Sequence, residues 1–169
     1  MRKSNFLDKL KKEEKIQAVE PSIDICTSYL EKSSNCLKSA KLLLNNELYE
    51  NSIGMSYYAM YNALLALLFR IGIKCENHSG SILLLKLLFD EHSMFNSISF
   101  AKRERIDKQY YVTAEKDETS KEAAKELYAN SEEFVLEIRV VINNLDNSAI
   151  SNFRKKFANL VGAKKPKTL

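Results

Sequence analysis

Residues 49–71, YENSIGMSYYAMYNALLALLFRI, decide the fold of this chain. Their larger apolar side chains recur at helical spacing and form one stripe: Tyr57, Tyr61, Leu64, Leu68 and Ile71. A second stripe holds only small side chains, Ala59, Ala63 and Ala66, beside which a neighbouring helix could approach closely. A helix that is apolar nearly all round is usually buried on more than one side. We therefore expect this helix either at the centre of a bundle or in a dimer interface.

Helical patterns continue on both sides of this segment, with short connections. We expect a charged helix over 4–18, a helix opened by Pro21-Ser22 and ending near Asn45-Asn46, and a stop for the central helix at Gly72, followed by a loop over 73–77. Next we expect a helix capped by Asn77 or Ser79 and reaching Phe89, and then a loop over 93–98. A polar helix should run from Ser99 to about Tyr111. We expect a further helix opened by a Thr119/Glu122 capping box and reaching Leu145, followed by a basic helix over 150–160. His92 then lies at the end of a helix.

These elements predict an all-α fold, an antiparallel helical bundle of about five main helices plus charged terminal helices. We divide the chain into a charged N-terminal helix (1–20), the bundle (22–146), and a basic C-terminal helix and tail (147–169). Only 4 of the 169 residues are Gly and 2 are Pro, which favours a few long helices over a β-fold with many turns. The apolar run from Tyr57 to Phe69 is shorter than the roughly 20 residues of a membrane span, so we expect no membrane association.

The three cysteines indicate a reducing environment. Cys26 and Cys36 lie on one predicted helix, about 15 Å apart along its axis. A disulfide needs Cα atoms within about 7 Å, so these two cannot form one. Neither they nor Cys75 belong to a Cys-x-x-Cys pair, and no secretion signal is visible. We expect a cytoplasmic protein with no metal site and no cofactor.

Basic residues gather at the two ends of the chain. No acidic residue follows Asp146, whereas six lysines and arginines do, and a second basic cluster lies before residue 16. Basic ends suit a polyanion such as RNA. They also keep a small protein soluble, and the sequence leaves both explanations open. The tail from Lys164 has few apolar residues, and we predict that it is disordered.

His78 is the candidate for acid–base chemistry. It follows a tight loop at the start of a predicted helix, where the helix dipole disfavours the imidazolium and attracts phosphate. Arg70 could grip a phosphate with its planar guanidinium, or simply hydrogen-bond the last carbonyls of its helix. Residues with polar or cationic side chains nearby are assigned to substrate binding: Lys74, Asn77, Arg103, Arg105 and Tyr110. A capping role for Asn77 and intrahelical ion pairs for Arg103 and Arg105 are the structural alternatives.

Several of these residues together resemble the stand-alone prokaryotic HEPN domains. The resemblance rests on Ser56-Tyr57-Tyr58-Ala59-Met60-Tyr61, then Ala63, Leu67, Leu68 and Gly72, and then His78 and Gly80; it covers roughly residues 22–145. It implies a helical bundle that often dimerises. Many members of the family are metal-independent ribonucleases that act as toxins or defence effectors, and are often encoded beside a small nucleotidyltransferase that neutralises them.

This sequence departs from the active members of the family at several positions. Active members carry an arginine and a histidine with four to six residues between them, whereas seven residues lie between Arg70 and His78. Leu65 stands where many relatives carry an arginine. Relatives also carry a later arginine followed by a tyrosine, which here correspond to Arg105 and Tyr110, but Gln109 stands where they tend to have an acidic residue. Three functions follow: a toxin-type RNA endonuclease using His78 and Arg70, a non-catalytic module that binds a nucleotidyltransferase partner, RNA or nucleotide, or a purely structural interaction protein. We expect a homodimer through the helix around 54–71.

Overall fold

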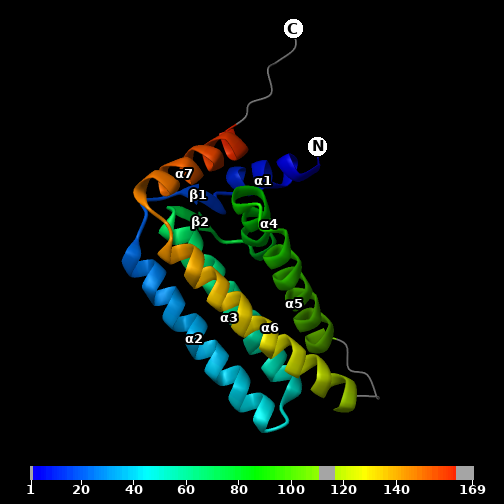
Figure 1. The fold of residues 1–169 in the computed structure, drawn as a ribbon. Coiled ribbons are helices and arrows are strands. Elements are labelled where there is room, and N and C mark those ends of the chain that lie inside the picture. The colour runs from blue at the N-terminus through cyan, green and yellow to red at the C-terminus, as the bar shows by residue number, and fades with distance from the viewer. Residues whose placement is uncertain (1, 111–116, 163–169) are drawn as a thin grey trace.

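The computed structural model describes the backbone of residues 2–110 and 117–162 and the side chains of 6–107 and 120–162. In chain order the elements are α1 (Arg2–Lys12), β1 (Ile16–Ala18), α2 (Ile23–Asn45), α3 (Tyr49–Arg70), β2 (Ile73–Cys75), α4 (His78–Phe89), α5 (His92–Tyr110), α6 (Asp117–Asn143) and α7 (Asn147–Gly162). The long helices α2, α3 and α6 run side by side, α4 and α5 cover another side, and α1, α7 and the two strands close one end (Figure 1). The predicted all-α helical bundle is confirmed.

α3 is the core of the bundle. Its apolar stripe and its alanines are buried, and α2, α6 and α5 pack around it. Two buried serines tie α2 to α3: Ser33 Oγ donates to the carbonyl of Ala59 at 2.8 Å, and Ser52 Oγ donates to that of Ala40 at 2.8 Å. Among the described residues α3 is also the one helix long and apolar enough to cross a membrane, although most of it is buried inside this bundle. Its all-round apolar surface is therefore explained within one chain and no longer argues for a dimer.

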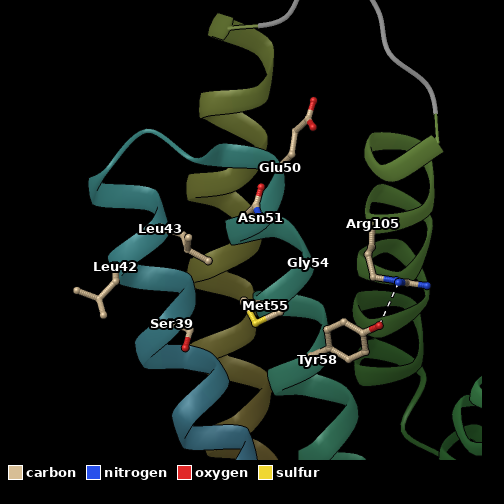
Figure 2. Close-up of a pocket in the computed structure, with 9 residues that line it drawn as sticks. All are labelled: Ser39, Leu42, Leu43, Glu50, Asn51, Gly54, Met55, Tyr58 and Arg105. Atoms are coloured by element: carbon tan, nitrogen blue, oxygen red, sulfur yellow. Dashed lines mark hydrogen bonds between the residues drawn. The ribbon is translucent and has the colours of Figure 1, made fainter.

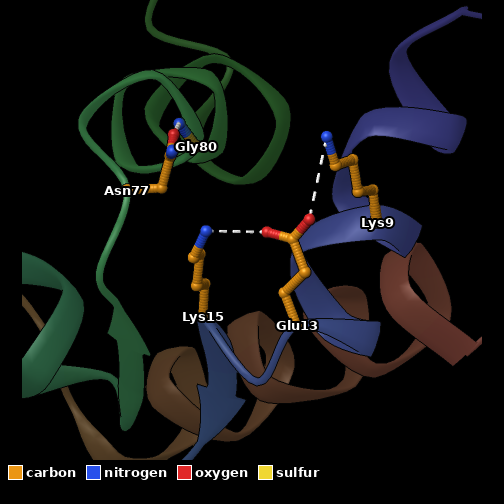
Figure 3. A network of polar contacts seen from close by, with 5 residues as sticks. All are labelled: Lys9, Glu13, Lys15, Asn77 and Gly80. Carbon is orange, nitrogen blue, oxygen red and sulfur yellow. Dashed lines mark hydrogen bonds and ion pairs between the residues drawn. The ribbon is translucent and has the colours of Figure 1, made fainter.

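The N-terminal segment differs from the prediction. The helix ends at Lys12, and residues 16–18 form β1, which pairs antiparallel with β2 so that Ile16 lies opposite Cys75. The predicted helix over 4–18 is therefore wrong beyond Lys12, and the predicted loop over 73–77 is wrong for residues 73–75. Glu13 lies in the turn between α1 and β1, with Lys15 Nζ at 2.8 Å and Lys9 Nζ at 3.7 Å from its carboxylate (Figure 3). The strand pair is a long-range contact, which local periodicity does not reveal.

Two helix boundaries in the second half also differ. α5 begins at His92, so no loop spans 93–98, because Met94, Ile98 and Ala101 form a buried stripe that extends the helix backwards. His92 accordingly lies at the start of α5 and not at the end of a helix, with Nε2 3.2 Å from Asp90 Oδ1. α6 begins at Asp117, ahead of Thr119, which is therefore not its N-cap.

Other local predictions are confirmed. Ser22 caps α2 by accepting a hydrogen bond from the amide of Ile25 at 3.1 Å, and α2 ends at Asn45 with Asn46 as its C-cap. Gly72 stops α3 with a φ of 77°, a left-handed conformation that favours glycine. The three cysteines are free thiols. The predicted tail from Lys164 lies outside the described residues.

Candidate functional site

His78 is the first residue of α4 and lies against the middle of α3. The turn at Gly72 and the strand β2 return the chain along α3, and Asn77 then caps α4 by accepting a hydrogen bond from the amide of Gly80 at 2.8 Å (Figure 3). The imidazole stacks on Tyr61, with 3.8 Å between ring centroids and 12° between planes. Its Nδ1 lies 2.6 Å from the hydroxyl of Tyr57. Two contacts to one helix therefore fix the ring.

Two cations from α5 complete the surroundings of His78. The Arg105 guanidinium carbon lies 5.3 Å and 5.4 Å from the ring centroids of Tyr57 and Tyr58, and Nη1 donates to the Tyr58 hydroxyl at 3.2 Å. Lys102, one helical turn earlier, donates from Nζ to Ser79 Oγ at 2.6 Å. We call these side chains the His78 cluster: Tyr57, Tyr58, Tyr61, His78, Ser79, Lys102 and Arg105.

Burial and charge act in the same direction on His78. Burial, and then the positive charges of Arg105 and Lys102, hold the pKa of His78 below its ordinary value. Burial and the neighbouring Arg105 also lower the pKa of Lys102. Burial raises the pKa of the Tyr57 hydroxyl, which therefore keeps its proton. At neutral pH the cluster thus holds a neutral imidazole beside a protonated phenol and a guanidinium.

This arrangement suits proton transfer next to an anion. A phenol hydroxyl both donates and accepts hydrogen bonds, so the contact between Tyr57 and His78 is compatible with either neutral tautomer of the imidazole. A neutral imidazole can act as a general base, and its conjugate acid can return the proton. Arg105 and Lys102 supply positive charge for a phosphate. Among residues 6–107 and 120–162, no group of three His, Cys, Asp or Glu side chains is placed to hold a metal ion.

Comparison with known proteins identifies the family. The family model of the HEPN domain matches residues 27–141, which is more than half of the chain. The chain belongs to the HEPN family. It is also 27% identical over 116 residues to a protein of Methanocaldococcus jannaschii named "Putative toxin MJ0605", an alignment that covers 64% of this chain and 82% of the relative.

In this HEPN domain Arg70 and His78 are not brought together. The Arg70 guanidinium donates from Nη2 to the carbonyl of Leu145 at 3.4 Å, in the connection between α6 and α7. Along α3, Arg70 lies about 20 Å beyond Tyr57, the hydrogen-bond partner of His78, at 1.5 Å per residue. Arg105 takes the place beside His78 that the sequence suggested for Arg70.

The other predicted binding residues have varied surroundings. Lys74 lies on β2 and forms an ion pair with Glu76 at 2.6 Å. Asn77 has the capping role that was its structural alternative. Arg103 is exposed, with its guanidinium carbon 5.8 Å from the ring centroid of Phe100. The side chain of Tyr110 lies outside the described residues.

Sequence reasoning misses two parts of the cluster. Tyr57 and Tyr61 resemble ordinary core residues in the sequence, although their spacing of four residues puts both rings on the same face of α3. Lys102 is not among the predicted binding residues, although it lies three residues before Arg105 on one face of α5. A cation pair at this spacing opposite an aromatic pair is the signal that could locate the cluster.

Proposed function

We propose that this chain is a toxin-type HEPN protein that cleaves RNA without a metal ion at the His78 cluster. One observation carries the proposal: a neutral, partly buried imidazole is fixed by two tyrosines and flanked by two cations from a neighbouring helix. The relative named as a toxin supports the biological class. The family resemblance supports the metal-independent chemistry.

The proposed reaction uses the ribose itself as nucleophile. His78 takes the proton of the 2′-hydroxyl, whose oxygen attacks the adjacent phosphorus while the bond from phosphorus to the 5′-oxygen breaks. The products are a 2′,3′-cyclic phosphate and a 5′-hydroxyl, whose oxygen takes the proton that the His78 imidazolium returns. Arg105 and Lys102 stabilise the charge that develops on the phosphate oxygens. Tyr57 is a positioning residue that holds the imidazole through Nδ1.

A second candidate is a non-catalytic HEPN module that binds RNA, nucleotide or a nucleotidyltransferase partner. The position of Arg70 favours it, because the arginine and histidine that active relatives carry close together are separated here. This candidate keeps the same cluster but uses its positive charge only for binding. For either candidate we further propose, from the family resemblance and not from the surface of α3, that the chain forms a homodimer and that a nucleotidyltransferase is its partner.

Cleavage of a mixed RNA by the purified protein in the presence of EDTA tests the two candidates. The nuclease proposal expects cleavage that is lost in His78→Ala, a loss of about 10²–10⁴-fold for a general acid–base residue. His92→Ala is the matched control, since it removes the other histidine, which is exposed. Thermal melts of both variants check folding. Equal cleavage by His78→Ala and wild type would refute the proposal, whereas RNA binding without cleavage by wild type would favour the binding module.

A further inference from the structure

A groove opens beside the His78 cluster, where α2, α3 and α5 meet (Figure 2). Its volume is about 660 Å³, which falls within the range of small-molecule sites. The residues that matter for its chemistry are Leu43, Glu50, Asn51, Gly54, Tyr58 and Arg105. Tyr58 and Arg105 belong both to the groove and to the cluster, and the hydrogen bond between them is visible at the edge of the groove. The groove therefore borders the proposed reaction site, with Tyr58 and Arg105 shared between them.

Gly54 gives independent evidence that the groove is kept open. It lies within α3, where a glycine destabilises a helix relative to alanine. Its φ is not positive, and a Cβ at this position would meet no atom within 4 Å. Neither backbone conformation nor packing within the chain therefore requires glycine here. What glycine does provide is free volume in the floor of the groove.

We infer that the groove binds the base of a nucleotide next to the scissile phosphate, a subsite that rests on the proposed function. Leu43 and Met55 supply apolar contact area, and Tyr58 supplies an aromatic ring. Arg105 places positive charge where the groove meets the cluster, which suits the phosphate of the same nucleotide. Glu50 and Asn51 lie toward the other end, where polar groups can contact the edge of a base (Figure 2).

The dimensions and the charge of the groove favour a nucleotide over a protein helix. From Asn51 to Tyr58 the groove follows α3 for about 10 Å at 1.5 Å per residue, comparable with one nucleotide from its phosphate to the far edge of its base. A cation at one end and a carboxylate at the other match a ligand with an anionic end and a hydrogen-bonding end. A docked helix would instead need a continuous apolar stripe.

Glu50 makes the subsite selective. A carboxylate only accepts hydrogen bonds, so it favours bases that present N–H donors. Guanine presents two adjacent donors on its Watson–Crick edge, whereas uracil presents one donor between two carbonyl acceptors. The subsite therefore prefers guanine to uracil, and Glu50→Gln weakens the preference. Glu47→Gln is the matched control, because Glu47 is exposed and does not line the groove.

The test is the binding of short, dye-labelled 2′-O-methyl oligonucleotides, measured by fluorescence anisotropy. These probes lack the attacking hydroxyl, so binding is measured independently of cleavage. Gly54→Leu fills the groove and should weaken binding of a guanine-containing probe by about ten-fold or more, the usual effect of losing one stacked base. Gly54→Ala adds a single carbon to the floor of the groove and should weaken binding less than Gly54→Leu. Both variants should melt no lower than wild type, because each replaces a helical glycine.

The outcomes separate the groove from the nuclease. Unchanged binding by Gly54→Leu, or no binding by wild type, would overturn the groove assignment even if RNA is cleaved. Groove-dependent binding without any RNA cleavage would support the subsite while the nuclease proposal fails. A Gly54→Leu protein that binds RNA normally but loses a dimer seen for wild type by light scattering would overturn the nucleotide assignment and show a protein interface.

Discussion

Replacing Gly72 by alanine should strongly destabilise the protein, while the same change at Gly54 should stabilise it. Gly72 has a φ of 77°, and an added Cβ would lie 2.5 Å from the carbonyl oxygen of Val19 and collide with Nη1 of Arg154. That guanidinium donates to the carbonyls of Val19 at 2.6 Å and of Gly72 at 3.4 Å. Gly72 thus lies where the end of α3, the segment after β1, and α7 meet.

The size of the effect follows from these contacts. An L-residue in the left-handed conformation costs about 1–2 kcal/mol. Displacing Arg154 loses a charge-assisted hydrogen bond worth about 1.5–3 kcal/mol. The lower entropy of the unfolded alanine chain offsets about 0.5–1 kcal/mol of this. We expect Gly72→Ala to lower the free energy of unfolding by about 2–4 kcal/mol, and Gly54→Ala to raise it by about 0.5–1 kcal/mol.

Urea denaturation followed by far-UV circular dichroism measures both variants. Gly72→Ala should unfold at lower urea concentration and melt roughly 5–15 °C lower than wild type. Gly54→Ala should shift both transitions slightly in the opposite direction. Shifts of the same sign in the two variants would refute the assignment of left-handed strain and crowding to Gly72 and of open space to Gly54.

Three further predictions concern the site and the tail. The pKa of His78 is lowered in the folded protein, so its contribution to stability is present above its ordinary pKa and is lost as pH falls toward the lowered value. His78→Gln should therefore make the melting temperature fall less steeply as the pH is lowered. Arg105→Ala should reduce RNA cleavage far more than Arg103→Ala, and Arg105→Lys should restore little in the same gel assay, since an ammonium cannot reproduce the planar guanidinium. Deleting the chain from Lys164 should flatten the salt dependence of RNA binding measured by anisotropy; an unchanged slope would exclude the tail.

The sequence predicts the fold well wherever the determinant is local. The period of the apolar stripe in 49–71, the Ser22 cap and the Gly72 stop each depend on a few neighbouring residues, and the structure has all three. The predictions fail where the determinant is distant. β1 exists because it pairs with β2 more than fifty residues away, and nothing in the sequence of 16–18 specifies that partner. The start of α5 escapes prediction because polar residues interrupt its buried stripe.

The same distinction between local and distant determinants holds for the candidate site. The position of His78 at a helix start could be predicted from the loop and the Asn77 cap. Its partners could not, because Tyr57 precedes it on another helix and Arg105 follows it on a third. Because Arg70 is the arginine nearest to His78 in the sequence, sequence reasoning pairs these two residues. The direction of α3 carries Arg70 away from the cluster, toward Leu145.

The origin of its positive charge distinguishes this cluster from a histidine with an arginine close by in sequence. An arginine on the same segment as the histidine is positioned by local backbone geometry. Here Lys102 and Arg105 both come from α5, one turn apart, so the charge beside His78 depends on how α5 packs against α3 and α4. The aromatic rings of Tyr57 and Tyr58 hold Arg105 at that interface.

Tyr57 contacts both the imidazole and the guanidinium, so loss of its ring should disturb both, whereas Tyr57→Phe should loosen only the imidazole. A shift in the pH dependence of cleavage in Tyr57→Phe, with RNA affinity unchanged, would demonstrate that division; equal losses of rate and affinity would contradict it.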